Sequence, residues 1–319
     1  MSRSNEVVYV ADFNEQRRLS YGISGDLQSN QMLICIPGIL ETRQSFTPLI
    51  SFIDGYSSCV VVTVDLCGRG QSDPLRGSQS YAMSVYLNDL TQLLSHLSNI
   101  YPKAMNNIHL LGTSMGGILA MYLIAHSAFK IKGLMLNDIG LTLPWMSIYS
   151  LYGQISKKEM KGHAILSKIL KVDSKLLADV QTQSHFDLPY KRDLMGMRFS
   201  NLLQNFKGEI LLLYGENSKL CTYLQVNELS AIFPTSQLIR IENEGHPVSF
   251  SPIVCSCIAT QLKLKKISLH AVDTSQDIDH LMESSNTIQV EHSQSTSKLP
   301  DMRMGSGIRQ FWKSFRSKE

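Results

Sequence analysis

The sequence predicts an α/β protein built on a mostly parallel sheet, and three observations support this fold class. Short apolar runs alternate with longer stretches of helical periodicity along most of the 319 residues, as in a series of strand–helix–strand units. Several of these runs are apolar without a break, which is typical of strands covered on both faces. Hydrophobic residues make up 43% of the chain and charged residues 18%, which indicates a folded globular protein and not a disordered one.

Eight strands are predicted from the apolar runs. In chain order they are Val7–Val10, Arg18–Ile23, Met32–Ile36, Val60–Val64, Ile108–Leu111, Gly133–Leu136, Ile210–Tyr214 and Leu238–Ile241. The first two are expected to form an antiparallel hairpin at the start of the sheet. Helical patterns fill the gaps between later strands, for example at Val85–Leu97 and Gly117–Ala125. The order of elements therefore favours an open sheet with helices on its faces.

One gap between predicted strands, residues 141–206, is too long for a simple crossover. Its sequence has helical character, including the stretch RDLMGMRFSNLLQNF at 192–206. Ligands of open α/β sheets bind at the carboxyl edge of the strands, so we interpret the insertion as a helical cap over that edge. The alternative is a set of additional scaffold helices. The predicted division is a core of residues 1–140 and 207–268, a cap of 141–206 and a tail of 269–319.

The tail changes in composition from about Ala271, where it becomes polar, rich in serine and poor in aromatic residues. Such a composition does not supply a packed core, so the tail is expected to be disordered. Within its last stretch, 301–319, four large apolar residues fall at helical spacing among basic residues: Ile308, Phe311, Trp312 and Phe315. A short basic amphipathic helix of this kind suits a membrane surface or a protein partner; the alternative is a frayed end.

Charge and cysteine content exclude several classes of protein. A net charge of +3 is too small to indicate a nucleic-acid partner, and neither a secretory signal nor a membrane-spanning run is found. The six cysteines have neither paired Cys-x-x-Cys nor disulfide-framework spacing, and Cys35 and Cys59 lie in apolar runs where buried free thiols are expected. We therefore expect a cytoplasmic protein, peripheral to a membrane if the tail binds one.

A Gly-x-Ser-x-Gly sequence at Gly112–Gly116 is the first sign of chemistry. It follows the apolar run Ile108–Leu111 and leads directly into a helical pattern. This strand–turn–helix setting is the one that a nucleophilic serine on a sharp turn requires. We therefore predict that Ser114 is a catalytic nucleophile, and that the N–H of Met115 points toward a developing oxyanion.

A nucleophilic serine needs a base, and His246 is the best placed of the nine histidines. It follows the last predicted strand, comes directly after Gly245 and lies in a loop ahead of the final helix. The other histidines fall in predicted helices, in a strand, in or near the tail, or in the cap. For the two cap histidines, His163 and His185, surface positions are favoured over substrate contact.

The loops after the third and fourth strands are expected to lie beside Ser114. In ICIPGILETRQSF, at 34–46, Pro37-Gly38 allows the backbone to pass close to the site, so the N–H of Ile39 is the predicted second oxyanion donor. The following loop, VDLCGRGQSD at 64–73, contains Asp65 and Arg69 and is interpreted as a structural turn.

Six stretches in a fixed order carry a resemblance to a known family: PGIL, DLCGRGQSD, GTSMGG, LNDIG, LLLYGENS and EGHP. Together they resemble the α/β-hydrolase superfamily, most closely its proteobacterial-type hydrolases, over about Tyr9 to Leu264. The resemblance implies an eight-stranded, mostly parallel sheet with a helical cap inserted after the sixth strand. It also implies a catalytic triad in the chain order serine, acid, histidine.

The acid is where the sequence departs from the family pattern. Relatives usually carry an aspartate shortly after the glycine that corresponds to Gly215, but here YGENSKLCT places Ser218 and Lys219 there. Asp138, in LNDIG, ends the sixth strand, and some members of the superfamily take their acid from that position. Glu216 is the second choice. The third hypothesis is a serine–histidine pair without an acid, which would lack the group that orients the imidazole.

The function predicted from these residues is that of a serine hydrolase acting on a small ester, thioester or related acyl substrate. Carbon–carbon bond hydrolysis and lactone opening would use the same groups. No metal or organic cofactor is implied. The alternative is a catalytically weakened scaffold used for binding, with the tail contacting a membrane or a partner.

Overall fold

Eight strands form one sheet, as predicted. The computed structural model describes residues 2–12, 15–57, 59–156 and 160–266. In spatial order the sheet contains β1 (Ser2–Asp12), β2 (Glu15–Gly25), β5 (Val60–Val64), β3 (Met32–Ile36), β6 (Ile108–Thr113), β7 (Ile131–Asn137), β11 (Glu209–Gly215) and β12 (Gln237–Ile241). The first two are antiparallel to their neighbours, and all later pairs are parallel. The predicted fold class is confirmed.

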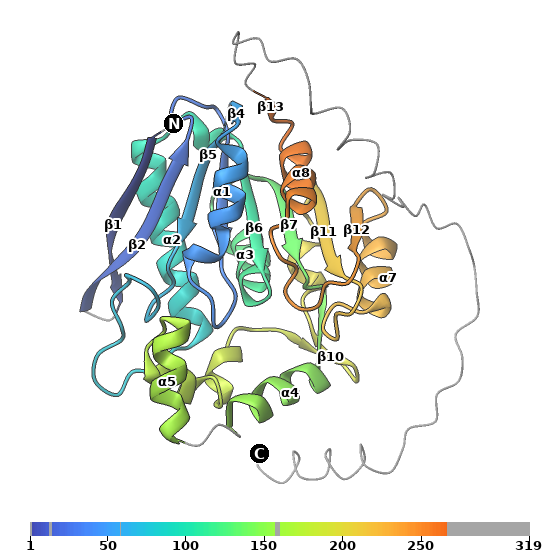
Figure 1. The fold of residues 1–319 in the computed structure, drawn as a ribbon. Helices are drawn as coiled ribbons and strands as arrows, with labels where there is room; N and C mark the ends of the chain where they lie inside the picture. Colours follow the sequence, from blue (N-terminus) through green and yellow to red (C-terminus); the bar gives the residue numbers. More distant parts are fainter. Residues whose placement is uncertain (1, 13–14, 58, 157–159, 267–319) are drawn as a thin grey trace, which may run out of the picture. The chain divides into compact units, whose positions relative to one another are not determined.

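Helices cover both faces of the sheet (Figure 1). One face packs against α1 (Thr47–Ile53) and α8 (Pro252–Gln261), and the other against α2 (Met83–Ile100) and α3 (Met115–His126). The remaining core helix, α7 (Tyr223–Ile232), connects β11 to β12. Short elements complete the core: η1 (Arg43–Phe46), β4 (Tyr56–Ser57), η2 (Ala104–Asn106) and β13 (Lys265–Lys266).

Strand β3 shows why unbroken apolar runs are the right signal here. All five of its residues are buried. Met32, Ile34 and Ile36 pack toward α2 and α3, whereas Leu33 and Cys35 pack toward α1 and α8. A strand with both faces covered needs apolar side chains at every position. Cys35 and Cys59 are buried free thiols, as expected.

The segment between β7 and β11 lies at the carboxyl ends of the parallel strands, below the sheet in Figure 1. It consists of β8 (Thr142–Pro144), α4 (Trp145–Ser156), α5 (Met160–Leu170), α6 (Ser174–Asp179), η3 (Gln183–Phe186), β9 (Lys191–Arg192), β10 (Gly196–Arg198) and η4 (Ser200–Leu203). We refer to residues 141–206 as the cap.

The prediction of helix throughout the cap is wrong for its last part. Instead of one continuous helix at 192–206, β10 pairs with both β8 and β9 in a small antiparallel sheet, and the short η4 follows it. The physical reason lies at Gly196, where an added Cβ would stand 2.0 Å from the carbonyl oxygen of Leu143. The close approach of the two backbones determines the structure at Gly196. The spacing of apolar residues in the segment gives no indication of this approach.

The expectation of a surface position for His185 is also wrong. Its side chain is completely buried, and burial, followed by the positive charge of Arg69, lowers the pKa of His185 to about 3. The imidazole is therefore neutral in the folded protein. In the unfolded chain its pKa returns to about 6.5, so below that pH the unfolded state takes up a proton that the folded state does not.

Stability is therefore expected to fall as the pH drops below about 6.5. At about pH 5 the His185 contribution corresponds to a loss of about 2 kcal/mol in the free energy of unfolding. The free energy of unfolding, determined by urea denaturation near pH 7 and near pH 5, measures this loss. The His185→Gln variant should lack this component of the pH dependence, whereas His163→Gln in the same cap should keep it. Equal pH dependence in wild type and His185→Gln would contradict the prediction.

Candidate active site

Ser114 lies on a sharp turn between the last residue of β6 and the first residue of α3. Its backbone φ of 51° and ψ of −117° are strained for a residue other than glycine. The neighbouring glycines make the turn possible. A Cβ on Gly116 would stand 2.1 Å from the carbonyl oxygen of Ile36, and one on Gly112 would stand 2.4 Å from the Gly116 carbonyl. The sequence GTSMGG therefore folds into the turn on which the prediction for Ser114 depends.

His246 contacts Ser114 on one side and Asp138 on the other. Its Nε2 lies 2.9 Å from the Oγ of Ser114, and its Nδ1 lies 2.7 Å from Oδ2 of Asp138. The carboxylate accepts a hydrogen bond from the Nδ1–H group of the imidazole. In this tautomer Nε2 carries no proton and can accept the proton of the serine hydroxyl. The structure thus brings together three of the predicted site residues, which are separated by up to 132 positions in the chain.

Asp138 is completely buried at the end of β7, with a backbone φ of 56°. Its Oδ1 accepts the N–H of Gly215 at 3.0 Å. Its Oδ2 accepts the hydroxyl of Ser218 at 2.7 Å, in addition to the imidazole. Ser218, which stands where the resemblance led us to expect the acid, donates to the carboxylate that faces His246. These bonds hold the carboxylate in a single orientation.

Glu216, the second choice for the acid, points to other partners. It is exposed, its Oε2 accepts the N–H of Asn243 at 3.0 Å, and its Oε1 lies 3.6 Å from Nη1 of Arg240. The structure does not bring Glu216 into contact with His246. Lys219, the other residue at the position where the resemblance led us to expect the acid, is exposed.

Asn137 is a further residue of the site, and no motif in the sequence singles it out. Its side-chain amide donates to the carbonyl of Val248 at 2.9 Å and accepts the N–H of Val248 at 3.1 Å. This pair of bonds fixes the loop that carries His246 to the end of β7, directly beside Asp138. The only signal in the sequence is an asparagine at the end of an otherwise apolar strand.

The two predicted oxyanion donors lie in the loops that the sequence indicates. Met115 begins α3, and Ile39 follows Gly38 in the loop after β3. Within the described ranges neither N–H donates to a protein acceptor. The N–H of Gly38 is occupied, because it donates to Oε2 of Glu41 at 2.7 Å. Burial raises the pKa of Glu41, and the bond from Gly38 opposes that rise.

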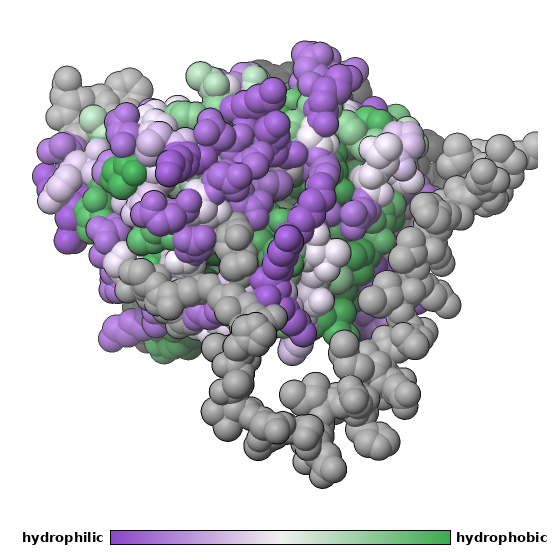
Figure 2. Space-filling model, turned by 90° about the horizontal axis from the view of Figure 1, so that it is seen from above, coloured by the Kyte–Doolittle hydropathy of each residue, from purple (hydrophilic) through white to green (hydrophobic). Residues whose placement is uncertain are grey.

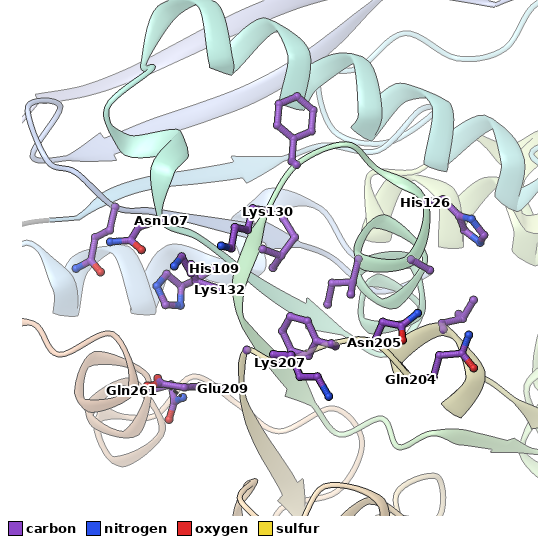
Figure 3. Close-up of a pocket in the computed structure, with 18 of the residues that line it drawn as sticks. Asn107, His109, His126, Lys130, Lys132, Gln204, Asn205, Lys207, Glu209 and Gln261 are labelled. Atoms are coloured by element: carbon purple, nitrogen blue, oxygen red, sulfur yellow. Dashed lines mark hydrogen bonds between the residues drawn. The ribbon is translucent and has the colours of Figure 1, made fainter.

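A large pocket lies at the opposite edge of the sheet. Its volume is about 970 Å³, and its lining includes Lys130, Lys132, Lys207 and His109 (Figure 3). These residues stand near the amino ends of β6, β7 and β11, whereas Ser114 follows the carboxyl end of β6. Figure 2 views this amino-end face, and hydrophilic side chains cover much of it. The pocket is separate from the Ser114 site.

Other expectations concern metals, membranes and the tail. Among the residues that the structure describes, no three His, Cys, Asp or Glu side chains are placed to hold a metal ion. In the same part of the chain no helix combines the length and apolarity needed to cross a bilayer. The amphipathic segment 301–319 lies outside the described residues.

Comparison with known proteins identifies the family of the chain. The family model described as "Serine aminopeptidase, S33" matches residues 28–248. A 3-hydroxybutyrate-oligomer hydrolase from Cupriavidus necator is 30% identical over 123 residues, which are 39% of this chain and 39% of that protein. The match therefore spans about two fifths of the curated relative.

Solved structures share the fold. A putative hydrolase from Rickettsia typhi is 18% identical, with a TM-score of 0.64 over 82% of this chain and 99% of that one. An α/β hydrolase from Novosphingobium aromaticivorans is 20% identical, with a TM-score of 0.62 over 82% of this chain and 98% of that one. Because the family model covers more than half of the chain, the protein belongs to the serine aminopeptidase S33 family, and its fold is that of the α/β hydrolases.

Proposed function

We propose that the protein is a serine hydrolase that cleaves a small ester, thioester or related acyl substrate through a covalent acyl-enzyme. The observation that carries the proposal is the continuous hydrogen-bonded chain from Ser114 through His246 to Asp138. A weak nucleophile, a base and a group that orients the base are the three parts that acyl transfer requires.

In the first half of the reaction, the Oγ of Ser114 attacks the substrate carbonyl while Nε2 of His246 takes the hydroxyl proton. The N–H groups of Met115 and Ile39 donate to the oxyanion that forms. The negative charge of Asp138 stabilises the imidazolium through Nδ1. Collapse of the tetrahedral intermediate breaks the bond to the leaving group, which takes the proton from Nε2, and the acyl group remains on Ser114.

In the second half, a water molecule gives a proton to Nε2 and attacks the acyl carbonyl. The same donors hold the second oxyanion. Collapse then releases the carboxylic acid product and returns the proton from His246 to Oγ of Ser114. Each group of the site thus ends in its starting state, and no further reagent is consumed.

Labelling with a fluorophosphonate probe tests the proposal. The wild-type protein should form one covalent adduct, located by peptide mass spectrometry at Ser114, and Ser114→Ala should form none. The matched control is Ser127→Ala, which removes the serine just after the end of α3 and should label like wild type. Folded wild-type protein that does not react would instead favour the binding-scaffold alternative, and an adduct that survives in Ser114→Ala would refute the choice of nucleophile.

A further inference from the structure

Arg69 lies in the loop after β5 and is almost completely buried, with 1% of its surface exposed. The loop is joined to the cap by two backbone hydrogen bonds, from Gly70 N–H to the Lys171 carbonyl at 2.8 Å and from Asp173 N–H to the Gly68 carbonyl at 2.7 Å. The guanidinium lies over the ring of Tyr86, 4.8 Å from its centroid.

Arg69 and His185 form a buried polar cluster beside Tyr86, and most side-chain nitrogen atoms of the two residues have no partner among the residues that the structure describes. Within the described part of the chain, Nε and Nη1 of Arg69 and both ring nitrogens of His185 form no hydrogen bond, and Nη2 of Arg69 makes a long one of 3.4 Å to the Tyr86 hydroxyl. Buried polar groups in folded proteins are almost always bonded. A buried charge without an anionic partner is costly, so an acceptor that the described residues do not supply would stabilise the cluster.

The cluster belongs to the same edge of the sheet as Ser114. Strands β5, β3 and β6 are consecutive neighbours in the sheet, and the loops that follow them carry Arg69, Ile39 and Ser114 respectively. Glu41, in the middle loop, is close enough to sense the charges of both His246 and Arg69. Arg69 is contributed by the core and His185 by η3 of the cap, and both lie near the ring of Tyr86, the guanidinium at 4.8 Å and the imidazole at 6.2 Å from its centroid.

We propose that Arg69 and His185 form a carboxylate-binding subsite, and that the preferred substrate is an ester whose acyl group ends in a carboxylate. The proposal rests on the proposed function of Ser114. The guanidinium fork can donate two parallel N–H bonds to the two oxygens of a carboxylate. The neutral imidazole of His185 supplies one further N–H donor. A substrate without the carboxylate leaves the buried guanidinium unpaired, which is how a polar subsite discriminates against an analogue that lacks its partner.

The substrate test compares the mono-4-nitrophenyl esters of succinate, glutarate and adipate with the same compounds methylated at the free carboxylate. We expect wild type to prefer the carboxylate form of the best chain length by about tenfold to a hundredfold in kcat/KM, mainly through KM. In Arg69→Met this ratio should fall to about one. The matched control is Lys175→Met, which removes a cap cation that lies over the ring of Tyr81 and should leave the ratio unchanged.

A binding measurement separates this inference from the proposed mechanism. Full-length Ser114→Ala protein is titrated calorimetrically with monomethyl glutarate and with dimethyl glutarate, and only the former should bind measurably at millimolar concentration. This arm needs neither catalysis nor a folded Arg69 variant. Hydrolysis with no preference at any chain length, or equal binding of the two compounds, would overturn the subsite. Absence of hydrolysis together with selective binding of the carboxylate would overturn the proposed mechanism and keep the subsite.

Discussion

Replacing His246 by alanine is expected to lower kcat by about six orders of magnitude, close to the loss from removing the nucleophile itself. Without an imidazole 2.9 Å from its Oγ, Ser114 keeps its proton and remains a weak nucleophile. The departing group also loses its proton donor. Hydrolysis of a 4-nitrophenyl ester followed at high enzyme concentration measures the residual rate.

The double variant Ser114→Ala/His246→Ala distinguishes a concerted unit from two independent contributions. When two groups act as one catalytic unit, removing either of them abolishes the contribution of both. The double variant should therefore be no slower than either single variant. His126→Ala serves as the control, because it removes an exposed histidine at the end of α3 and should retain the wild-type rate. Multiplicative losses in the double variant would contradict the proposed pairing of Ser114 and His246.

Replacing Asp138 by asparagine is expected to lower kcat by about 10⁴, as when the orienting acid of a serine–histidine pair is lost. An amide at this position can donate to Nδ1 of His246. It then favours the tautomer with the proton on Nε2, which cannot accept the serine proton, and it no longer balances the charge of the imidazolium. Initial rates with one ester across a range of pH measure the effect.

Glu216→Gln is the matched control for Asp138→Asn. Its carboxylate is exposed and faces Arg240 and Asn243, so wild-type kcat is expected. A fall of several orders of magnitude in Glu216→Gln, with Asp138→Asn unaffected, would reverse the assignment of the acid. If neither variant slows, the remaining interpretation is a serine–histidine pair that works without an acid.

The sheet and the position of Ser114 could be predicted because their signals are local. Strands β3 and β5 have the bounds that the apolar runs indicate, since strands covered on both faces tolerate few polar side chains. The turn at Ser114 is encoded by glycines at positions where any Cβ would meet backbone atoms. Neither inference needs knowledge of residues distant in the chain.

The acid and the cap could not be predicted in the same way, because they depend on distant partners. Asp138 is 108 positions from His246, and its contact with Ser218 exists only once β7 and β11 lie side by side. Likewise, the strand at Gly196–Arg198 forms because a second backbone passes close to Gly196. The burial of His185 within the cap has no periodic signature, so an isolated histidine in a polar stretch looks like a surface residue.

The paired bonds between Asn137 and Val248 have a consequence for the order in which the enzyme becomes active. Ser114 is synthesised early, and its turn needs only β3, β6 and the start of α3. The base, however, reaches Ser114 only after the chain has been made through Val248 and its loop has docked on the end of β7. Under the proposed mechanism a nascent or partly folded chain therefore holds an exposed serine without reactivity. Recovery of esterase activity during refolding then reports the docking of this last loop, and not the formation of the turn.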